Sequence, residues 1–493
     1  NVEIQRTSTG DLPEGWVIST LGEISTKPQY GWTTKANHES GEVKLLRTTD
    51  ITSGKIDWAS VPYCTKEPDD LKKYFLKAGD IVISRAGSVG VSYLLTDTDN
   101  AVFASYLIRF RPIEPVNKKY VYYFLKSPDY WKAIGKSTLG IAVPNVNATK
   151  LAKVKIPIAT PNEQKRIVAE IEKQFSRLDE AVDNLKRVKA NLKRYKASVL
   201  KAAVEGKLTE EWRKKHPEVE HAAKLLERIL ADRRKKWEEA ELAKIKAKGK
   251  EPTDDKWKKK YKEPLKPDLN GLPKLPDGWV WSSVDCLGEI VTGTTPSTKK
   301  KEYYGGDIPF FKPTELNQGY SVTSAAVYLT EVGAEKARLI PPHSVMVTCI
   351  GATIGKVGFS RVHGTTNQQL NTLIPDKRYL YSQYLFFACI SPFFFKKIID
   401  NASSTTLPII NKSKFAVLPI MVPPFKEQTI IVDEIERCLS IIDEVNLAVD
   451  VCVQRAGHLC QSILKKAFSG KLVDQDSNDE SARKLLGTIK AKG

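Results

Sequence analysis

The sequence of this chain is written twice, and this duplication constrains its fold more than any other feature. Segment 12–17 (LPEGWV) recurs at 275–280 as LPDGWV. Four more pairs keep nearly the same offset: 21–24 with 287–290, 163–164 with 427–428, 167–172 with 431–436, and 200–208 with 464–472. Chance does not hold one register over five separate segments. The chain is therefore a tandem duplication, and we expect two similar halves.

Each half begins with a predicted globular domain, which we call domain 1 (12–160) and domain 2 (275–424). Both contain short strand-like runs, such as 80–84, 101–103 and 345–347, separated by Gly, Pro, Asn and Asp. The pattern predicts an α+β fold with two sheet-rich mixed α/β domains.

Each domain is followed by a predicted long helix, at 161–207 and 425–472. Both helices carry apolar residues at intervals of seven: Ile171, Leu178, Leu185, Leu192 and Val199 in the first, and Ile435, Ile442, Val449, Ala456 and Ile463 in the second. Further seam residues are predicted near the half-heptad positions: Ile167, Val188 and Tyr195 in the first helix, and Ile431, Cys452 and Leu459 in the second. So narrow a stripe predicts a coiled-coil seam. If the halves are related by a pseudo-two-fold axis, the helices are antiparallel and the domains lie at opposite ends of a rod; alternatively, each helix packs on its own domain.

Two segments lie outside this repeated plan. Segment 208–272 is predicted as a charged helical linker, with a helix over about 221–248 followed by a stretch rich in Pro and Lys. We interpret it as a solvated connector, with contact to the DNA backbone or to a partner subunit as the alternative. Segment 473–493 is predicted as a polar tail with frayed structure.

The charge of the chain favours a polyanionic partner. Its 493 residues include 77 Lys and Arg against 58 Asp and Glu, a net charge of +19. Nucleic acid is the commonest such partner, although an ordinary basic protein also fits. The seven scattered cysteines and six histidines argue against a disulfide framework or a metal site. The scattered cysteines fit reduced thiols, so we expect a cytoplasmic protein. No apolar run is long enough to cross a membrane.

Together these motifs resemble, over nearly the whole chain, the specificity subunit (HsdS) of type I restriction-modification systems. The shared features are the LPxGW openings, the Glu-Gln pair that follows a proline at the start of each helix, and the Gly-Lys-Leu after each helix. Domain 2 adds 293–297 (GTTPS), 303–309 (YYGGDIP), 312–316 (KPTEL), 351–356 (GATIGK) and 367–369 (NQQ); domain 1 adds 30–32 (YGW), 46–51 (LRTTDI) and 79–87 (GDIVISRAG).

The resemblance implies a DNA-reading protein that works in a complex. Each domain, called a target-recognition domain in this family, would read one half of a bipartite site on double-stranded DNA, and the coiled coil would set the spacing. The partners would be two methyltransferase subunits (HsdM) and restriction subunits (HsdR). The chain would need no cofactor of its own, whereas the complex would use S-adenosylmethionine, ATP and Mg²⁺ in the partner subunits. Because the domains differ, as at Arg85 against Ile350 and at Gly90-Val91 against Gly355-Lys356, the half-sites should differ.

Candidate DNA contacts are basic, hydroxyl, amide or aromatic side chains near glycine-rich turns, where the backbone can approach a phosphate. In domain 1 they are Tyr30, Trp32, Thr33, Lys35, Arg47, Thr48, Arg85 and Ser88. In domain 2 they are Thr294, Thr295, Ser297, Lys299, Lys300, Lys312, Thr314, Thr353, Lys356, Asn367, Gln368 and Gln369.

These candidates also have plain structural interpretations. Segments 85–90 and 351–356 also fit ordinary tight turns, and Trp32 also fits a partly buried ring. Residues 367–369 suit either adenine edges or bonds to neighbouring backbone. Trp16 and Trp279, in the repeated opening, are interpreted as core anchors.

Enzyme motifs are not convincing in this sequence. Segment 351–356 resembles a P-loop, but it has three residues between its glycines, and Val357 stands where Ser or Thr is required. Segment 422–425 (VPPF) resembles an amino-methyltransferase motif, but Val422 cannot accept a hydrogen bond from the target amine. Two alternatives stay open: a self-contained DNA-modifying enzyme with a disguised site, and a coiled-coil adaptor whose globular domains bind proteins.

Overall fold

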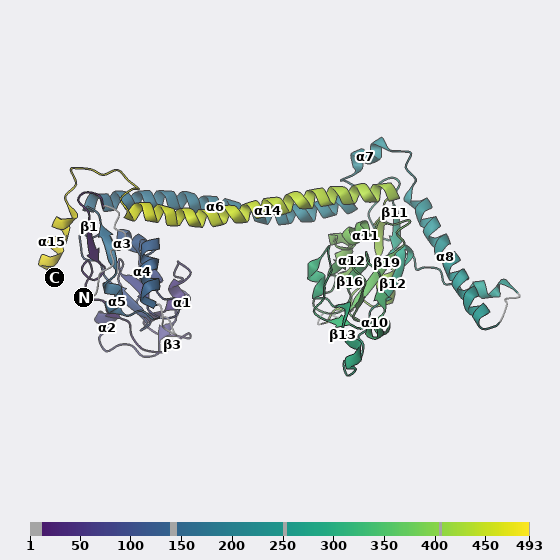
Figure 1. Cartoon of the computed structure of the whole chain (residues 1–493), viewed down its shortest axis with the longest axis horizontal. Coiled ribbons are helices and arrows are strands. Elements are labelled where there is room, and N and C mark those ends of the chain that lie inside the picture. The colour runs from purple at the N-terminus through teal and green to yellow at the C-terminus, as the bar shows by residue number, and fades with distance from the viewer. Residues whose placement is uncertain (1–11, 139–144, 250–253, 404–406, 493) are drawn as a thin grey trace. The chain divides into compact units, whose positions relative to one another are not determined.

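The computed structural model describes residues 12–138, 145–249, 254–403 and 407–492 (Figure 1). It divides into two compact units. Unit 1 comprises residues 1–187 and 449–493, and unit 2 comprises residues 188–448. Each unit contains one sheet-rich domain and a part of both long helices, as the α+β prediction requires.

Domain 1 is built from short strands and helices. Its strands are β1 (Val17–Thr20), β2 (Gln29–Tyr30), β3 (Ala36–Asn37), β4 (Lys44–Leu46), β5 (Tyr63–Cys64), β6 (Ile81–Ser84), β7 (Ser92–Leu94), β8 (Ala101–Phe103), β9 (Leu107–Phe110) and β10 (Lys155–Ile158). Its helices are α1 (Thr48–Ile51), α2 (Leu71–Tyr74), α3 (Lys118–Phe124), α4 (Pro128–Thr138) and α5 (Ala148–Ala152). The strands form sheets in the orders β2-β9-β6-β7, β3-β5-β4-β8 and β1-β10.

Domain 2 repeats this plan. Its strands are β11 (Val280–Ser283), β12 (Gly288–Thr292), β13 (Tyr304–Phe311), β14 (Tyr328–Leu329), β15 (Leu339–Ile340), β16 (Val345–Thr348), β17 (Val357–Phe359), β18 (Gly364–Thr366), β19 (Leu370–Pro375) and β20 (Pro419–Val422). Its helices are α9 (Val284–Leu287), η2 (Lys301–Tyr303), η3 (Glu315–Gln318), α10 (Glu331–Ala337), α11 (Ser382–Cys389), α12 (Pro392–Asn401) and α13 (Lys412–Ala416). The sheet orders are β12-β19-β16-β17, β14-β13-β18-β15 and β11-β20.

The strand pairings show that the two domains share most of their topology; they differ in one edge strand, since β3 pairs with β5 whereas β15 pairs with β18. In each, a single parallel pair (β4 with β8, β13 with β18) lies in an otherwise antiparallel sheet. In each, the strand after the LPxGW opening pairs with the strand before the long helix, as in Val17↔Ile158 and Val280↔Val422. All residues of β6 and β16 are buried, as their continuous apolar runs predict.

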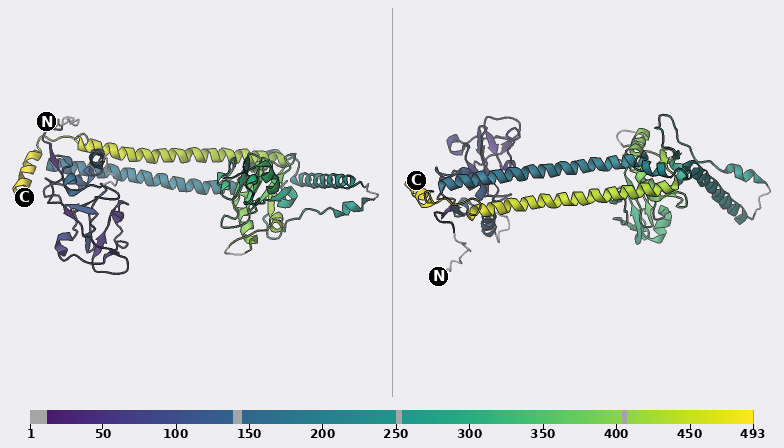
Figure 2. Two further views of the ribbon diagram at one scale, coloured as in Figure 1. Left: turned by 60° about the horizontal axis from the view of Figure 1, so that its bottom comes forward. Right: turned by 90° about the horizontal axis from the view of Figure 1, so that it is seen from above.

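The long helices are α6 (Pro161–Val204) and α14 (Phe425–Phe468). Each begins at or just after a proline, and the chain leaves each through a glycine with positive φ, Gly206 at 70° and Gly470 at 67°. In unit 1 the start of α6 packs on the end of α14, since Ile171 and Ile463 belong to one core. In unit 2 the end of α6 packs on the start of α14 through Leu200 and Ile435. The helices therefore run antiparallel within each unit, as predicted (Figure 2).

The predicted seam needs one correction. Six of its ten residues are buried and the other four are half-buried. Of the proposed half-heptad residues, however, only Ile167 and Ile431 are buried; Val188, Tyr195, Cys452 and Leu459 are exposed. The second column lies elsewhere, at Phe175, Val182, Cys438, Val445, Val453, Cys460 and Ala467. The ends of both helices also belong to the domain cores, so the two predicted packing modes coexist.

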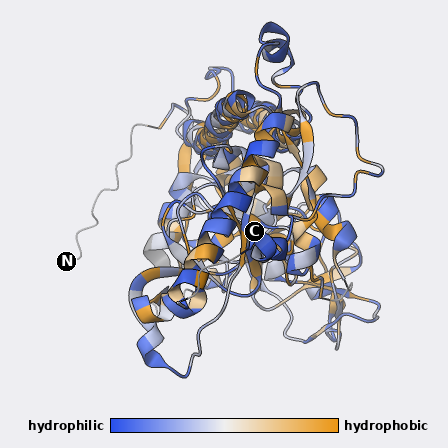
Figure 3. Ribbon diagram, turned by 90° about the vertical axis from the view of Figure 1, so that its right-hand side faces the viewer, coloured by the Kyte–Doolittle hydropathy of each residue, from blue (hydrophilic) through white to orange (hydrophobic). Residues whose placement is uncertain are grey.

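The charged linker is more than a solvated connector. It contains α7 (Glu210–Lys215), α8 (Ala222–Ala247) and η1 (Asp255–Lys260). Helix α8 mixes hydrophilic and hydrophobic residues, as the ribbon coloured by hydropathy shows for the helices of the chain (Figure 3), and Ala222, Leu225 and Ile229 lie in the core of unit 2 with Trp279. The first turns of α8 are therefore an integral part of unit 2.

The predicted polar tail was also wrong. It contains α15 (Ala482–Lys492), which buries Ala482, Leu485 and Ile489 in the core of unit 1. The backbone N–H of Ala482 donates to the carbonyl of Gly15 at 2.9 Å, just as Ala222 donates to Gly278 at 2.8 Å in unit 2. Segments 221–229 (HAAKLLERI) and 481–489 (SARKLLGTI) are thus a sixth repeated pair. In each unit, the helix that begins with this repeated segment, α8 or α15, docks on the LPxGW opening of the domain.

Among the described residues, no helix has both the length and the apolar character needed to cross a membrane.

Candidate nucleic-acid interface

The predicted contact residues of domain 1 gather in one set of loops, which we call loop cluster 1: residues 30–35, 47–50, 85–90 and 104–106. The loop 104–106 connects the others through backbone hydrogen bonds. Trp32 N–H donates to the Phe103 carbonyl at 2.7 Å, and Ser105 N–H donates to the Trp32 carbonyl at 2.9 Å. Ala104 N–H donates to Leu46, and Arg85 N–H donates to Tyr106. Side chains far apart in sequence therefore meet at one edge of the sheets.

Domain 2 has the same arrangement in loop cluster 2: residues 293–300, 312–315, 349–356 and 367–369. Thr294 N–H donates to the Thr366 carbonyl at 2.9 Å, and Asn367 N–H donates to Phe311 at 3.1 Å. Cys349 N–H donates to the Gln369 carbonyl at 2.7 Å. The two clusters thus share one backbone frame, although their side chains differ.

Two glycines hold this frame together because it leaves no room for a side chain. A Cβ atom on Gly31 would lie 2.2 Å from the carbonyl oxygen of Ala104, and one on Gly293 would lie 2.2 Å from that of Asn367. These distances are far below van der Waals contact. Each glycine lets the first loop of its cluster (30–35 or 293–300) lie directly against the central loop (104–106 or 367–369).

The glycine-rich turns are equivalent in both domains. Gly90 N–H donates to the Ser84 carbonyl at 2.8 Å, and Gly355 N–H donates to the Thr348 carbonyl at 2.8 Å. Their φ values of 87° and 83° favour glycine. The Gly90–Gly355 equivalence expected from the sequence is therefore confirmed. The turns are tight turns, and their exposed residues Ser88 and Thr353 stay candidates for DNA contact.

Loop cluster 1 contains an arginine whose side chain lies over a tyrosine ring. The Arg85 guanidinium lies over the Tyr30 ring, 5.0 Å from its centroid. The Tyr30 hydroxyl in turn accepts a hydrogen bond from Ala148 N–H at 2.9 Å. The buried Nε of Arg85 has no hydrogen-bond partner among the residues that the structure describes, and Tyr106, whose carbonyl accepts from Arg85 N–H, is 62% exposed. This arrangement leaves Arg85 with donor capacity while its ring contact restricts its orientation.

Other predicted residues of loop cluster 1 have structural tasks. The Trp32 indole N–H donates to the Lys66 carbonyl at 2.9 Å, and its ring packs 5.4 Å from Tyr74. Arg47 forms an ion pair with Asp50 through Nη2 at 2.9 Å. The Thr48 hydroxyl accepts from Ser84 at 3.5 Å. Thr33 and Lys35 are exposed.

The amide residues of loop cluster 2 divide between structure and surface. Asn367 is buried, its Nδ2 donates to Gln369 Oε1 at 2.8 Å, and its Oδ1 accepts from Gln369 N–H at 3.1 Å. This local bonding was the plain interpretation of these two residues. Gln368 is exposed, and its Oε1 accepts from the Thr295 hydroxyl. Gln368 is therefore the amide available at the surface.

The remaining candidates of domain 2 lie in the other loops of cluster 2. Exposed side chains are Ser297, Lys299, Lys300 and Thr314; half-buried ones are Thr294, Lys312 and Lys356. Lys312 N–H donates to Glu315 at 2.8 Å, as Arg47 N–H donates to Asp50 at 2.7 Å. Position 312 thus corresponds to position 47.

One predicted equivalence was off by a residue. Arg85 corresponds to Cys349 rather than to Ile350, because the backbone N–H of each donates to the loop 104–106 or 367–369. The backbone carbonyl of each also accepts a hydrogen bond, from Val146 N–H for Arg85 and from Ile410 N–H for Cys349. Burial raises the pKa of the Cys349 thiol to about 12. One domain therefore places a cation where the other places a neutral, buried thiol.

Sequence reasoning missed three exposed aromatic residues here. Tyr106 corresponds to Gln369 in the central loop, and only the strand register reveals this. Trp131 and Phe395 are 41% and 46% exposed and lie against Gly90 and Gly355, respectively. A sequence signal existed for this pair, because a Ser-Pro dipeptide occurs in both domains and each ring comes three residues after its proline, at 128 or 392.

The Glu-Gln pairs are not surface features. The Trp16 indole N–H donates to Glu163 at 2.7 Å, and that of Trp279 donates to Glu427 at 2.9 Å. All four residues are buried, so the tryptophans are core anchors as predicted. Gln164 and Gln428 accept from Asn117 N–H and Tyr381 N–H. These pairs fasten each long helix to its domain.

Comparison with known proteins agrees with this architecture. The family model described as type I restriction modification DNA specificity domain matches residues 13–194 and 276–446. The chain belongs to this family. Two relatives are the HindI specificity subunit of Haemophilus influenzae, 26% identical over 83% of this chain and 90% of the relative, and the EcoKI specificity subunit of Escherichia coli, 25% identical over 98% and 97%.

Solved structures show the same fold. The HsdS subunit from Thermoanaerobacter tengcongensis aligns with a TM-score of 0.55 at 18% identity, covering 94% of this chain and 99% of that one. A chain from a structure of the type I R-M system aligns with a TM-score of 0.61 at 18% identity, covering 94% and 100%. The resemblance inferred from the motifs is confirmed.

Proposed function

We propose that this specificity subunit reads a bipartite, asymmetric site on double-stranded DNA, one half with each target-recognition domain. The observation that carries this proposal is the pair of loop clusters. They share one backbone frame, including equivalent hydrogen bonds and glycines, yet present different side chains at its surface. A repeated scaffold with diverged contact residues suits two related domains that read different base sequences.

The chemistry of each cluster suggests how it reads DNA. In cluster 1, Arg85 suits the O6 and N7 acceptors of guanine, while Ser88, Thr33 and Lys35 suit phosphates. In cluster 2, Gln368 suits an adenine edge, and Lys299 and Lys300 suit phosphates. The other predicted contacts, at 30, 32, 47 and 48 and at 294, 295, 297, 312, 314, 353, 356, 367 and 369, belong to the same frames, several of them as supports.

The coiled coil sets the spacing of the half-sites and carries the partners in this proposal. A helix of 44 residues is about 66 Å long, at 1.5 Å per residue. Two methyltransferase subunits (HsdM) and the restriction subunits (HsdR) join the complex. In α14, Ile441, Leu447, Val451 and Leu459 are between 37% and 68% exposed. Exposed apolar side chains on a helix favour protein contact.

We further propose that the chain catalyses nothing itself and acts in the cytoplasm. S-adenosylmethionine, ATP and Mg²⁺ would then be bound by the partner subunits. A purified chain that methylates or cuts DNA unaided would contradict this.

Methylation mapping tests the proposal directly. DNA is compared from cells that make this chain with its methyltransferase partner and from cells that make the partner alone. A two-part modified motif that depends on this chain is the expected result. The same methylation without the chain, or none with an active partner, contradicts the proposal and favours a coiled-coil protein adaptor.

A further inference from the structure

Unit 2 carries an extension, which we call the basic arm: residues 233–249 and 254–262 of the described chain. It comprises the second part of α8 and the short helix η1. Its aromatic residues pack on one another: the Trp237 and Trp257 rings stack with centroids 6.2 Å apart, and Trp237 lies 5.3 Å from Tyr261. These rings fold the return segment back on α8, so the arm has a defined shape.

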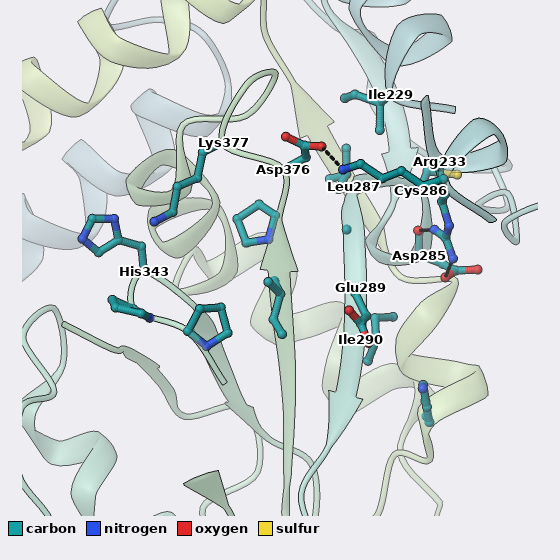
Figure 4. Close-up of a pocket in the computed structure, with 17 residues that line it drawn as sticks. Ile229, Arg233, Asp285, Cys286, Leu287, Glu289, Ile290, His343, Asp376 and Lys377 are labelled. Carbon is teal, nitrogen blue, oxygen red and sulfur yellow. Dashed lines mark hydrogen bonds and ion pairs between the residues drawn. The ribbon is translucent and has the colours of Figure 1, made fainter. Parts of the chain in front are cut away.

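The base of the arm is anchored to domain 2. Arg233 forms an ion pair with Asp285 at 3.0 Å, and Lys236 forms one with Asp376 at 2.8 Å. These residues line a cavity of about 620 Å³ between α8 and the start of β12 (Figure 4). Hydrogen bonds from Arg378 and Lys236 hold the pKa of Asp376 well below its usual range. The anchor is therefore charged at neutral pH, and it fixes the direction of α8.

The arm concentrates the charge of the chain. Residues 233–249 and 254–262 contain 12 Lys and Arg against 5 Asp and Glu, so the arm supplies +7 of the net charge of +19. The exposed side chains of Lys246, Lys259, Lys260 and Lys262 have no ion pair among the described residues. Exposed cations that have no ion pair within the described part of the chain favour an external polyanion.

The composition of the arm favours DNA over a protein partner. Lysine is depleted in protein–protein interfaces, which rely on exposed aromatic and apolar anchors. The described arm exposes no large hydrophobic side chain, because its aromatic rings stack on each other. Lysine suits phosphates, which it neutralises as a point charge without reading bases.

We propose that the basic arm binds the phosphate backbone of duplex DNA outside the half-site read by domain 2. The inference rests on the proposed function. The arm is anchored beside Gly288 at the start of β12, whereas loop cluster 2 follows Thr292 at its end, about 14 Å away along the strand. From Arg233 to Ala247, α8 extends about 21 Å. The base of the arm is therefore at the opposite end of β12 from loop cluster 2, which favours flanking DNA over the bases of the half-site as its target.

The test measures the salt dependence of DNA binding by the complex of this chain with its methyltransferase partner. The variant K246Q/K259Q/K260Q/K262Q is compared with the matched K246R/K259R/K260R/K262R, which keeps the charge. Each binds a long duplex with flanking DNA and a short duplex trimmed to the two half-sites. We expect the log–log salt slope of the Gln variant on the long duplex to fall by about 0.9 per lost contact, at most about 3.6. The Arg variant and the short duplex should give wild-type slopes.

Several outcomes overturn the proposal. An unchanged slope on the long duplex does so, as does an equal fall on both duplexes or an equal fall in the Arg variant. Loss of the methyltransferase or nuclease partner with an unchanged DNA slope would identify the arm as a protein-docking surface instead. Thermal unfolding of each variant verifies that the arm has stayed folded. Failure of the proposed function appears separately, as absence of sequence-selective binding by the wild-type complex.

Discussion

Units 1 and 2 fasten their long helices with the same glutamate but give it different partners. In unit 1, Glu163 accepts from Trp16 and from the side-chain amide of Gln475 at 2.6 Å. In unit 2, Glu427 accepts from Trp279, from the Thr209 hydroxyl, and from Arg213 in an ion pair. A duplicated fold thus preserves the contact between glutamate and tryptophan, while the residues that complete the site diverge.

The loop clusters show the same division at the surface. The backbone hydrogen bonds and the glycines of the two clusters are equivalent, whereas the side chains differ. Arg85 in cluster 1 corresponds to Cys349 in cluster 2, and Tyr106 corresponds to Gln369. What the fold needs is repeated, whereas the side chains that the loops present differ. Variants that affect one copy alone test how far this separation extends.

Exchange of domain 2, residues 275–424, is expected to have the largest effect. Replacing it by the corresponding domain of another family member should change one half of the methylated motif completely and leave the other half intact. Methylation mapping measures this. A change in both halves would show that the domains do not read independently.

The docked helices α8 and α15 should respond equally to matched truncations. Leu225 and Leu485 are 2% and 4% exposed and occupy equivalent core positions. L225A and L485A should each cost about 2–5 kcal/mol in local stability. Hydrogen exchange should detect the loss in unit 2 alone for L225A and in unit 1 alone for L485A. An effect of L485A much smaller than that of L225A would contradict the equivalence of the two helices.

The sequence predicted much of this architecture because repetition and periodicity are properties of the chain itself. The duplication, the two domains and the heptads at 171–199 and 435–463 were all readable. The docking of α15 was not predicted, because a short amphipathic helix next to polar residues has the composition of a tail. Its match with 221–229 carried the missing signal.

The geometry of the candidate interface was predicted only in part, since exposure depends on tertiary contacts. The Gly-rich turns do lie in the loop clusters, but the sequence did not reveal that Asn367 is buried or that Arg47 forms an ion pair with Asp50. Tyr106 carries no motif at all. It joins the cluster only because β9 pairs with β6 and places it beside Arg85.

Single substitutions in the loop clusters sharpen the comparison of the two readers. R85A should weaken binding of the cognate site by about 1–3 kcal/mol, roughly 5- to 150-fold, through the half-site of domain 1. Q368A is the matched change in domain 2 and should act through the other half-site. Binding to duplexes mutated in either half assigns each effect. If R85A weakens binding equally to cognate and unrelated duplexes, Arg85 contacts phosphate and does not read a base.

The two glutamates should differ when each is replaced by glutamine. In E427Q, the new NH₂ group meets the donors Arg213 and Thr209, so the loss should be about 1–3 kcal/mol. In E163Q, the Gln475 amide can turn its oxygen toward the new donor, so the loss should be smaller. Thermal and denaturant unfolding measure both, and an equal loss would show that their different partners do not matter.

The pH dependence of E163Q gives the finest distinction. Burial is the largest influence on Glu163 and raises its pKa above the ordinary value of 4.5. A raised pKa means that the folded state holds the proton more tightly. The stability contributed by this group is therefore complete below pH 4.5 and is lost as the pH rises through the raised pKa. Since glutamine does not titrate, E163Q should become more stable relative to the wild type as pH increases above 4.5, measured as the difference in free energy of unfolding of unit 1. A difference that moves the other way would mean that Trp16, Gln475 and nearby Arg166 stabilise the ionised carboxylate more than burial opposes it.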